Sequence, residues 1–373
     1  MARESKPIEG RIAPAEPVAA GKVGGMDPTP EDTASDQGVD RFAWLSRIDR
    51  FWIVGVLLIL IIYFSVTTSA GSFLGTDNLR NIALDTATVL LLALGETFVI
   101  ITAGIDLSVG AVLTFSGVLA GVVMLHFSGT QAQVDAQTYP HQGMAIPLGV
   151  AAGLVGGLAW GLFNGILITR FKLPSFIVTL GSYGMATGGA DLLAGGTNIT
   201  SVPDNFHNYV DGRGYFTIPI PVVVAIIAIV LSYVALSRTR FGQYTAAIGA
   251  NAQGTRLAGV NVDRQLLKIY ALAGLLSGVA GVLDLGRFGT ENLSAHTTDN
   301  LNAIAAVVIG GTSLFGGIGT IVGTVVGAFI PTVLANGFTI QNVSSFWQLV
   351  AVGAIIIIAV QIDQWRRSRA AGQ

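Results

Sequence analysis

The stretch TATVLLLALGETFVIITAG, residues 86–104, decides the fold class of this chain. Glu96 is its one ionisable side chain. An α-helix rises about 1.5 Å per residue, so about 20 mostly apolar residues cross the hydrocarbon core of a bilayer. The stretch therefore predicts a transmembrane helix.

The composition of the whole chain agrees with a membrane location. Of its 373 residues, 51% are hydrophobic and 11% are charged, and the mean hydropathy is +0.65. A typical soluble domain is roughly 25% charged. These values exclude both a soluble globular protein and a disordered one. The 48 Gly residues suit helices that pack closely in lipid.

Nine further apolar stretches follow the same composition. One of them, residues 303–314, is short and is bordered by pairs of Gly. Counting it, the sequence predicts an all-α polytopic membrane protein with about ten transmembrane helices, some of them discontinuous. The other eight stretches are residues 52–68, 109–125, 145–168, 175–194, 218–236, 269–285, 319–337 and 346–362.

Positive charge predicts how these helices are oriented. Cytoplasmic segments of membrane proteins carry an excess of Lys and Arg. If the N-terminus is inside, seventeen of the 20 Lys and Arg residues fall in cytoplasmic segments. The sequence therefore predicts that both termini are cytoplasmic. These segments are residues 1–51, 169–174, 237–268 and 362–373.

The two ends of the chain differ in composition from its centre. Residues 1–50 mix charged residues with Pro, Ala and Gly and hold no signal-peptide core, so we expect a disordered cytoplasmic tail. Residues 51–365 form the predicted transmembrane domain, which includes the cytoplasmic loop 237–268. Residues 366–373 form a second cytoplasmic tail.

Glycine spacing indicates how the helices pack. Every fourth residue from Gly149 to Gly165 is Gly, which gives a groove that a neighbouring backbone can approach. We favour packing over a moving seam as its role. Residues 103–110, AGIDLSVG, also resemble residues 310–317, GGTSLFGG. Repeated Gly-interrupted segments point to discontinuous helices near a transport site.

The sequence lacks the residues and motifs that several kinds of catalysis and binding require. It has no Cys, no P-loop motif and no nucleophile–base motif, so we expect no catalytic residue and no enzyme activity. The net charge of −2 predicts no nucleic-acid partner. The four His residues are not clustered and give little support for a metal site. We expect them to be solvated in or beside external loops: His126, His141, His207 and His296.

Charged residues inside apolar stretches are costly in a membrane, so each is a functional hypothesis. Glu96 has no nearby cation in the sequence, and it either lines a pathway or is a buried hydrogen-bonding partner. Asp106 and Ser108 precede a helix, where they either cap its first amides or line a pathway. Asp284 lies three residues before Arg287, and we expect these two to pair on one helix face.

The loop 237–268 holds one short predicted helix. It covers residues 251–258, with Asn251 as its N-cap and Gly259 as its stop. A compact helix of small residues with one Arg suits a groove in a soluble partner. An ordinary cytoplasmic turn is the alternative.

Four segments resemble one family, the membrane (permease) subunits of bacterial carbohydrate ABC importers of the ribose/xylose/arabinose type. The motifs GIDLSVG and IGGTSLFGG, in this order, are the specific part of the match, and the resemblance extends from about residue 50 to residue 365. The segments are residues 95–110 (GETFVIITAGIDLSVG), 170–180 (RFKLPSFIVTL), 240–260 (RFGQYTAAIGANAQGTRLAGV) and 303–323 (AIAAVVIGGTSLFGGIGTIVG).

The resemblance implies an ABC-importer permease fold and a set of partners. Such subunits form a membrane dimer, here a homodimer, within the lipid of the bacterial inner membrane. A cytoplasmic ABC ATPase docks on the coupling helix in the long loop and uses the ATP, so this chain binds no cofactor itself. An extracytoplasmic sugar-binding protein delivers the substrate. The matched coupling residues are Ala250, Asn251, Arg256, Leu257 and Gly259.

The resemblance also implies the substrate, a monosaccharide such as a pentose, hexose or polyol. The apolar stretches agree, because they hold few charges but many hydroxyl and amide groups. Two alternatives stay open: an ion-coupled secondary transporter that uses Glu96 and Asp106, or an ABC permease for another small solute such as a branched-chain amino acid. The candidate pathway residues are Glu96, Asp106, Ser108, Asn164, Ser175, Phe176, Asn302 and Asn336.

The sequence departs from the family's pattern at a few positions. Glu96 stands where an apolar residue is usual, Asn300 and Asn302 where acidic residues are frequent, and Val352 where Lys is common. Ala250 replaces the second Gly of a Gly-Gly-Asn motif. The first three changes alter charge beside a possible pathway, so they bear on the substrate rather than on the class of protein.

Overall fold

Long apolar runs form the helices, and side-chain caps and left-handed Gly residues separate them. The computed structural model describes residues 43–69, 71–212 and 218–371. Asn261 caps one helix by accepting a hydrogen bond from the backbone N–H of Arg264 at 2.9 Å. Thr320 caps another helix in the same way, because its hydroxyl oxygen accepts from the backbone N–H of Gly323 at 3.1 Å. Gly289, with φ +68°, ends the helix that Asn261 begins.

The described residues are helical apart from their connections and one isolated bridge between Ile199 and Glu291. Each of the ten predicted stretches overlaps a separate helix, which confirms the all-α fold. The helices are α1 (Ala43–Thr67), α2 (Thr76–Ile101), α3 (Val109–Ser128), α4 (Gln131–Asp135), α5 (Gln142–Arg170), α6 (Ser175–Ala194), α7 (Asp204–Asp211), α8 (Ile220–Arg238), α9 (Arg240–Leu257), α10 (Val262–Phe288), α11 (Asp299–Ile309), α12 (Ile321–Ile340) and α13 (Ser345–Ala371).

Six of these helices are long and apolar enough to cross a membrane: α2, α3, α5, α8, α10 and α12. The chain is therefore a multi-pass membrane protein, while the count of ten spans stays a prediction. Most of the predicted tail 1–50 lies outside the described residues. Its last eight residues, 43–50, are the beginning of α1.

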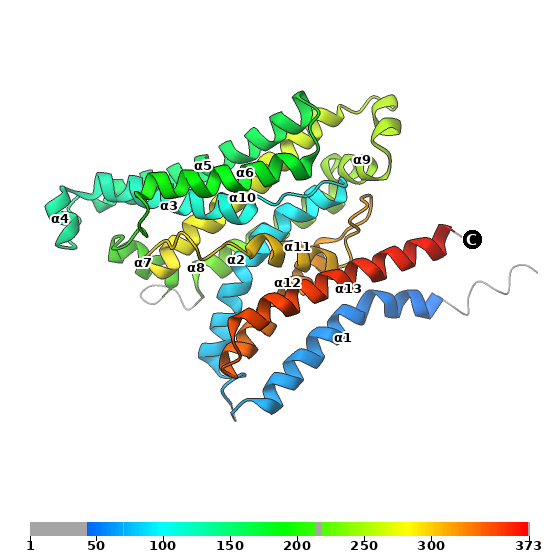
Figure 1. Ribbon diagram of the computed structural model, residues 1–373, viewed down its shortest axis with the longest axis horizontal. Coiled ribbons are helices and arrows are strands. Elements are labelled where there is room, and N and C mark those ends of the chain that lie inside the picture. Colours follow the sequence, from blue (N-terminus) through cyan, green and yellow to red (C-terminus); the bar gives the residue numbers. More distant parts are fainter. Residues whose placement is uncertain (1–42, 70, 213–217, 372–373) are drawn as a thin grey trace, which may run out of the picture. The chain divides into compact units, whose positions relative to one another are not determined.

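Helices α3, α5 and α10 lie side by side and approach backbone to backbone (Figure 1). A Cβ at Gly157 of α5 would stand 2.4 Å from the carbonyl oxygen of Gly274 in α10. A Cβ at Gly153 would stand 2.8 Å from the carbonyl oxygen of Ser116 in α3. No larger residue fits there, so the four-residue Gly repeat packs helices as predicted.

Helix α2 lies at the centre of residues 51–373. All of its residues from Leu90 to Ile101 are buried, and it packs against α10, α11, α12 and α8. The apolar surface of this half of α2 is thus covered by protein. Hydropathy alone does not distinguish such a helix from one that faces lipid.

The ion pairs group the connecting segments into two ends. Asp263 at the start of α10 pairs with Lys172 at 2.7 Å and with Arg256 at 2.8 Å, which joins two segments predicted to be cytoplasmic. Arg80 pairs with Asp211 at 3.1 Å, which joins two segments predicted to be external. The 27 residues of α10 span about 40 Å, so its two termini mark opposite ends.

Candidate functional site

Two helix breaks meet near the centre of the protein. The chain leaves the helical conformation between α2 and α3, where Ala103 has φ +60°. It does so again between α11 and α12, where Gly316 and Gly317 have φ +84° and +81°. The backbone N–H of Gly317 donates to the carbonyl oxygen of Ile101 at 2.8 Å. The two segments that resemble each other in sequence are thus both discontinuous and in contact.

Helix α9 reaches this same junction. A Cβ at Gly249 would stand 1.8 Å from the carbonyl oxygen of Ile101 and 2.4 Å from the backbone nitrogen of Gly317. Ala250, the next residue, packs against Gly317. A Cβ added to Gly317 would lie 3.3 Å from the Cα of Ala250. The segment predicted to couple to a partner therefore touches both breaks directly.

The first break is held by its own side chains and by side chains from two helices, α5 and α6. Asp106 accepts from the backbone N–H of Ser108 at 2.9 Å and from its hydroxyl at 2.6 Å. The Ser108 oxygen accepts from Asn164 Nδ2 of α5 at 2.9 Å, and Asn164 Oδ1 accepts from Ser182 of α6. The hydroxyl of Ser175 accepts from the backbone N–H of Ile105 at 3.3 Å.

Four of the eight pathway candidates, Asp106, Ser108, Asn164 and Ser175, are therefore brought together at one break. Asp106 caps a backbone amide, as one of the two interpretations of this residue requires. Ser108 occupies the N-cap position of α3 but makes no capping bond there. These contacts leave the pathway role a prediction.

Glu96 lies in α2 beside this junction and is fully buried. Neither carboxylate oxygen makes a hydrogen bond of regular geometry among the described residues, and its electrostatic neighbours are the charge and the backbone N–H of Asp106. Buried polar groups are nearly always paired, so an unpaired carboxyl group is a functional candidate.

The remaining candidates lie elsewhere. Asn336 forms a reciprocal amide pair with Asn78, at 3.0 Å and 2.8 Å, which joins α12 to α2. Phe176 is half exposed. Asn302 is in α11, where its side-chain amide donates to Asp299 at 3.2 Å.

Asn302 also lines a cleft of about 260 Å³ beside the C-terminal end of α10. Residues of α2, α10, α11, α12 and α13 contribute to its wall, and most of its polar groups are hydroxyls, amides and carboxylates. Those that bear charge or can donate are Asp85, Thr88, Asp284, Arg287, His296, Thr298, Asp299, Asn302, Thr332 and Gln348. Phe288 adds an aromatic face.

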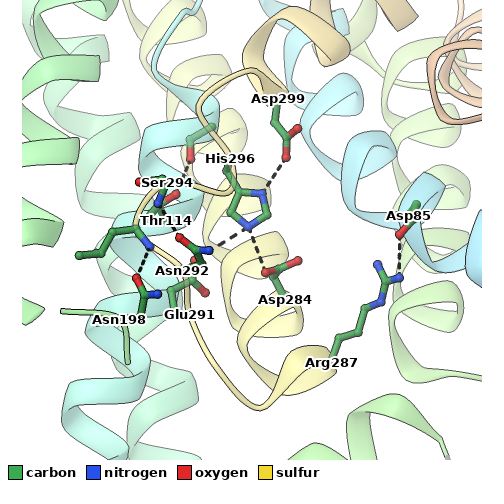
Figure 2. Close-up of polar contacts among 12 residues, drawn as sticks. Asp85, Thr114, Asn198, Asp284, Arg287, Glu291, Asn292, Ser294, His296 and Asp299 are labelled. Atoms are coloured by element: carbon green, nitrogen blue, oxygen red, sulfur yellow. Dashed lines mark hydrogen bonds and ion pairs between the residues drawn. The ribbon is translucent and has the colours of Figure 1, made fainter. Parts of the chain in front are cut away.

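The predicted pair between Asp284 and Arg287 is wrong. Arg287 pairs instead with Asp85 of α2 at 2.6 Å, and Asp284 contacts His296 at 3.0 Å (Figure 2). Residues three apart on a helix are neighbours, but at the end of α10 each of these side chains has a better partner on another element. Neither partner could be predicted from the sequence, because each is distant along the chain.

The expectation that His296 is solvated is also wrong. His296 is 8% exposed, with Nδ1 2.7 Å from Asp299 and Nε2 3.0 Å from Asp284 (Figure 2). Burial opposes its charge, but the hydrogen bonds and charges of the two carboxylates outweigh burial and raise the pKa of His296 to about 11. The i, i+3 spacing of His296 and Asp299 was the available signal in the sequence. His126 and His141 are exposed as expected, whereas His207 contacts the carbonyl oxygen of Gly286 at 3.0 Å.

Glu291 completes this cluster and was missed by sequence reasoning. Its side chain is fully buried, and neither carboxylate oxygen has a hydrogen-bond partner among the described residues. Burial, followed by the charge of Asp284, raises the pKa of Glu291 above its ordinary value, against the opposing effect of His296. The closest approach to His296 Nε2 is 3.9 Å.

The predicted short helix in the long loop is confirmed. Helix α9 is broken at Asn251, whose φ and ψ are −162° and 95°. Its side-chain oxygen accepts from the backbone N–H of Gly254 at 2.8 Å, as an N-cap does. Gly259, with φ +86°, follows the end of the helix. The Leu257 side chain is 85% exposed, and Arg256 beside it is half exposed.

Comparison with known proteins gives one family. A family model described as "Branched-chain amino acid transport system / permease component" matches residues 78–360. The ribose import permease of Bacillus subtilis is 40% identical over 310 residues, which are 83% of this chain and 90% of that protein. The fructose import permease of Rhizobium meliloti is 37% identical, over 85% of each chain.

A third relative, the ribose import permease of Escherichia coli K12, is 35% identical over 86% of this chain and 94% of its own length. No solved structure matches the chain.

Proposed function

The chain belongs to the permease family described as branched-chain amino acid transport system / permease component, and on this premise we propose that it is the membrane subunit of an ATP-driven sugar importer. The observation that carries the proposal is that relatives 35–40% identical over more than four fifths of this chain are ribose and fructose import permeases. The substrate proposed is a monosaccharide, delivered by an extracytoplasmic binding protein.

The cleft beside α10 supports a polyhydroxylated substrate over an aliphatic amino acid. Its hydrogen-bonding groups come from five helices, and Phe288 supplies an aromatic face. A sugar presents hydroxyls that can both donate and accept, and so it can pair with carboxylates, amides and Arg alike. A branched aliphatic side chain offers no hydrogen-bonding group to these polar side chains.

The short helix of α9 supports docking of a cytoplasmic ATPase. Leu257 and Arg256 present an exposed apolar group and an exposed cation side by side. Just before the kink of α9 at Asn251, Gly249 lies against both helix breaks. A displacement of this helix by ATP binding in the partner would therefore press on the two discontinuous segments. A homodimer in the bacterial inner membrane with both termini cytoplasmic completes the proposed assembly.

One observation favours a second candidate, an ion-coupled secondary transporter. Glu96 is buried without a hydrogen bond of regular geometry in the described part of the chain and interacts with Asp106. Paired acids at membrane depth serve as proton relays in such transporters. The exposed helix of α9 has no role in that mechanism.

Reconstitution in lipid vesicles tests both candidates. The purified chain is assembled with and without an ATPase and a binding protein copurified from its host, and uptake of radiolabelled pentoses, hexoses, polyols and branched-chain amino acids is measured. We expect uptake of one sugar class only in the complete assembly with ATP. Uptake by the chain alone under a proton gradient would establish the secondary transporter, and uptake of amino acids alone would overturn the sugar assignment.

A further inference from the structure

The geometry around His296 points to a binding site for a divalent transition-metal ion, of the Zn²⁺ class, held by Asp284, Glu291 and His296. The three ligand atoms lie within 4.8 Å of one another. Asp284 is in α10, and Glu291 and His296 are in the connection between α10 and α11. This inference does not depend on which solute is transported, although Asp284 and His296 also line the cleft proposed for the substrate.

The distances fit an ion after a small adjustment. Zn²⁺ bonds to His nitrogen and carboxylate oxygen at about 2.0–2.2 Å, so ligand atoms around one ion stand roughly 3–4 Å apart. His296 Nε2 is 3.0 Å from Asp284 and 3.9 Å from Glu291. A closing movement of about 1 Å would bring the widest separation into this range.

His296 is oriented as a metal ligand. Its Nδ1 lies 2.7 Å from a carboxylate oxygen of Asp299, which leaves Nε2 directed at the other two acids (Figure 2). In metal sites the ligating His commonly donates its second N–H to a carboxylate, which fixes the ring and raises its basicity. Asp299 supplies that second contact here.

The surroundings of Glu291 support the metal site independently of the orientation of His296. It is fully buried, and its two oxygens have no hydrogen-bond partner in the described residues. Its backbone is fixed by the bridge to Ile199, with hydrogen bonds of 3.1 Å and 2.8 Å. A Cβ at Gly117 of α3 would lie 2.2 Å from one of its oxygens, so the carboxylate fills a space that α3 leaves open with a Gly.

A buried carboxylate held in this way is costly as an anion unless a cation reaches it, and because the pKa values of Glu291 and His296 are raised, an ion would bind by displacing their protons. A divalent ion would satisfy Glu291, Asp284 and His296 together. One nitrogen and two carboxylate oxygens suit Zn²⁺ or Mn²⁺ better than Cu⁺, which prefers sulfur. The cleft lined by Asp284, His296 and Asp299 gives an ion access to the site.

The test uses the full chain, purified in lipid nanodiscs, stripped with a chelator and equilibrated with Zn²⁺ at micromolar free concentration. Elemental mass spectrometry should find one Zn²⁺ per chain. Glu291→Gln and His296→Gln should weaken binding at least tenfold, and Asp299→Asn by about 10- to 100-fold, as contacts behind a ligand typically do. Glu96→Gln, which removes a buried carboxylate elsewhere, is the matched control and should retain the metal.

A second measurement needs no variant. Co²⁺ added to the stripped wild-type chain should give visible absorption bands of a site with nitrogen and oxygen ligands, and Zn²⁺ should abolish them. Equal Zn²⁺ content in wild type and Glu291→Gln, or a wild-type chain that binds neither ion, would overturn the proposal.

Discussion

The two helix breaks have similar sequences but are held by different means. The first, residues 102–108, is held by polar side chains: Asp106, Ser108, Asn164 and Ser175 satisfy its backbone or one another, and Asn300 of α11 donates to the Leu107 carbonyl oxygen at 3.2 Å.

The second break, residues 310–320, is held by its own backbone and by close packing. Ser313 N–H donates to the Ile318 carbonyl oxygen at 3.0 Å, and a Cβ at Gly323 would stand 2.0 Å from the carbonyl oxygen of Gly310. We therefore expect the first break to be sensitive to loss of polar groups and the second to increases in size.

The largest effect is expected at Gly249, where both breaks meet. Gly249→Val would place side-chain atoms on the Ile101 carbonyl and the Gly317 amide. Overpacking typically costs about 1–3 kcal/mol, and here the neighbours are backbone atoms that have no other rotamer, so the upper end applies. We expect loss of uptake and a clearly lower melting temperature in nanodiscs.

Gly184→Val is the control for this substitution, because no atom lies within 4 Å of an added Cβ there. An unchanged melting temperature for Gly249→Val would contradict the close approach of α9 to the breaks.

A matched pair of Thr→Val substitutions compares the breaks directly. In the first, buried Thr179 accepts from the Leu107 N–H at 3.1 Å and lies 3.0 Å from the carbonyl oxygen of Ser175. In the second, buried Thr312 has no side-chain hydrogen-bond partner in the described residues. Thr179→Val should cost about 1–3 kcal/mol, and Thr312→Val should be neutral or stabilising.

Urea or thermal unfolding of the two variants, in the same lipid, gives the change in the free energy of unfolding for each. Equal destabilisation by both would remove the distinction between a break held by side chains and a break held by packing.

The smallest effect on stability is expected at Arg256, which lies at the far end of α9 from the breaks. Its ion pair with Asp263 is exposed, and such pairs contribute about 0–1 kcal/mol. Arg256→Glu should leave the melting temperature nearly unchanged but abolish substrate-stimulated ATP hydrolysis by the proposed partner. Lys268→Glu is a control of the same charge change, and full stimulation in Arg256→Glu would count against the assignment of this helix to coupling.

Sequence reasoning succeeded where the signal is local. Apolar length located the ten helices, the Gly repeat located the backbone contacts of α5, and Asn251 and Gly259 located the ends of the short helix. Each of these depends on residues within a few turns of one another. The break at Ala103 was also accessible, because Gly-interrupted motifs favour discontinuous helices.

Sequence reasoning failed where a polar side chain has possible partners on several different elements. Arg287 takes Asp85, which is about 200 positions away, rather than Asp284. His296 and Glu291 are buried by the fold of the connection after α10 and not by their own surroundings in the sequence. Asn336 pairs with Asn78 for the same reason. Composition sets the cost of burying such groups, but only the tertiary structure selects what satisfies them.

The burial of α2 from Leu90 to Ile101 has a consequence for synthesis. The helix that covers it from one side, α12, contributes Thr324, whose hydroxyl lies 2.7 Å from that of Thr97. At about 5–20 residues per second, the ribosome needs roughly 10 to 50 seconds to pass from Glu96 to Thr324. Throughout that interval the insertion machinery or the lipid must accommodate an unpaired carboxyl group in a helix whose final neighbours have not yet been made.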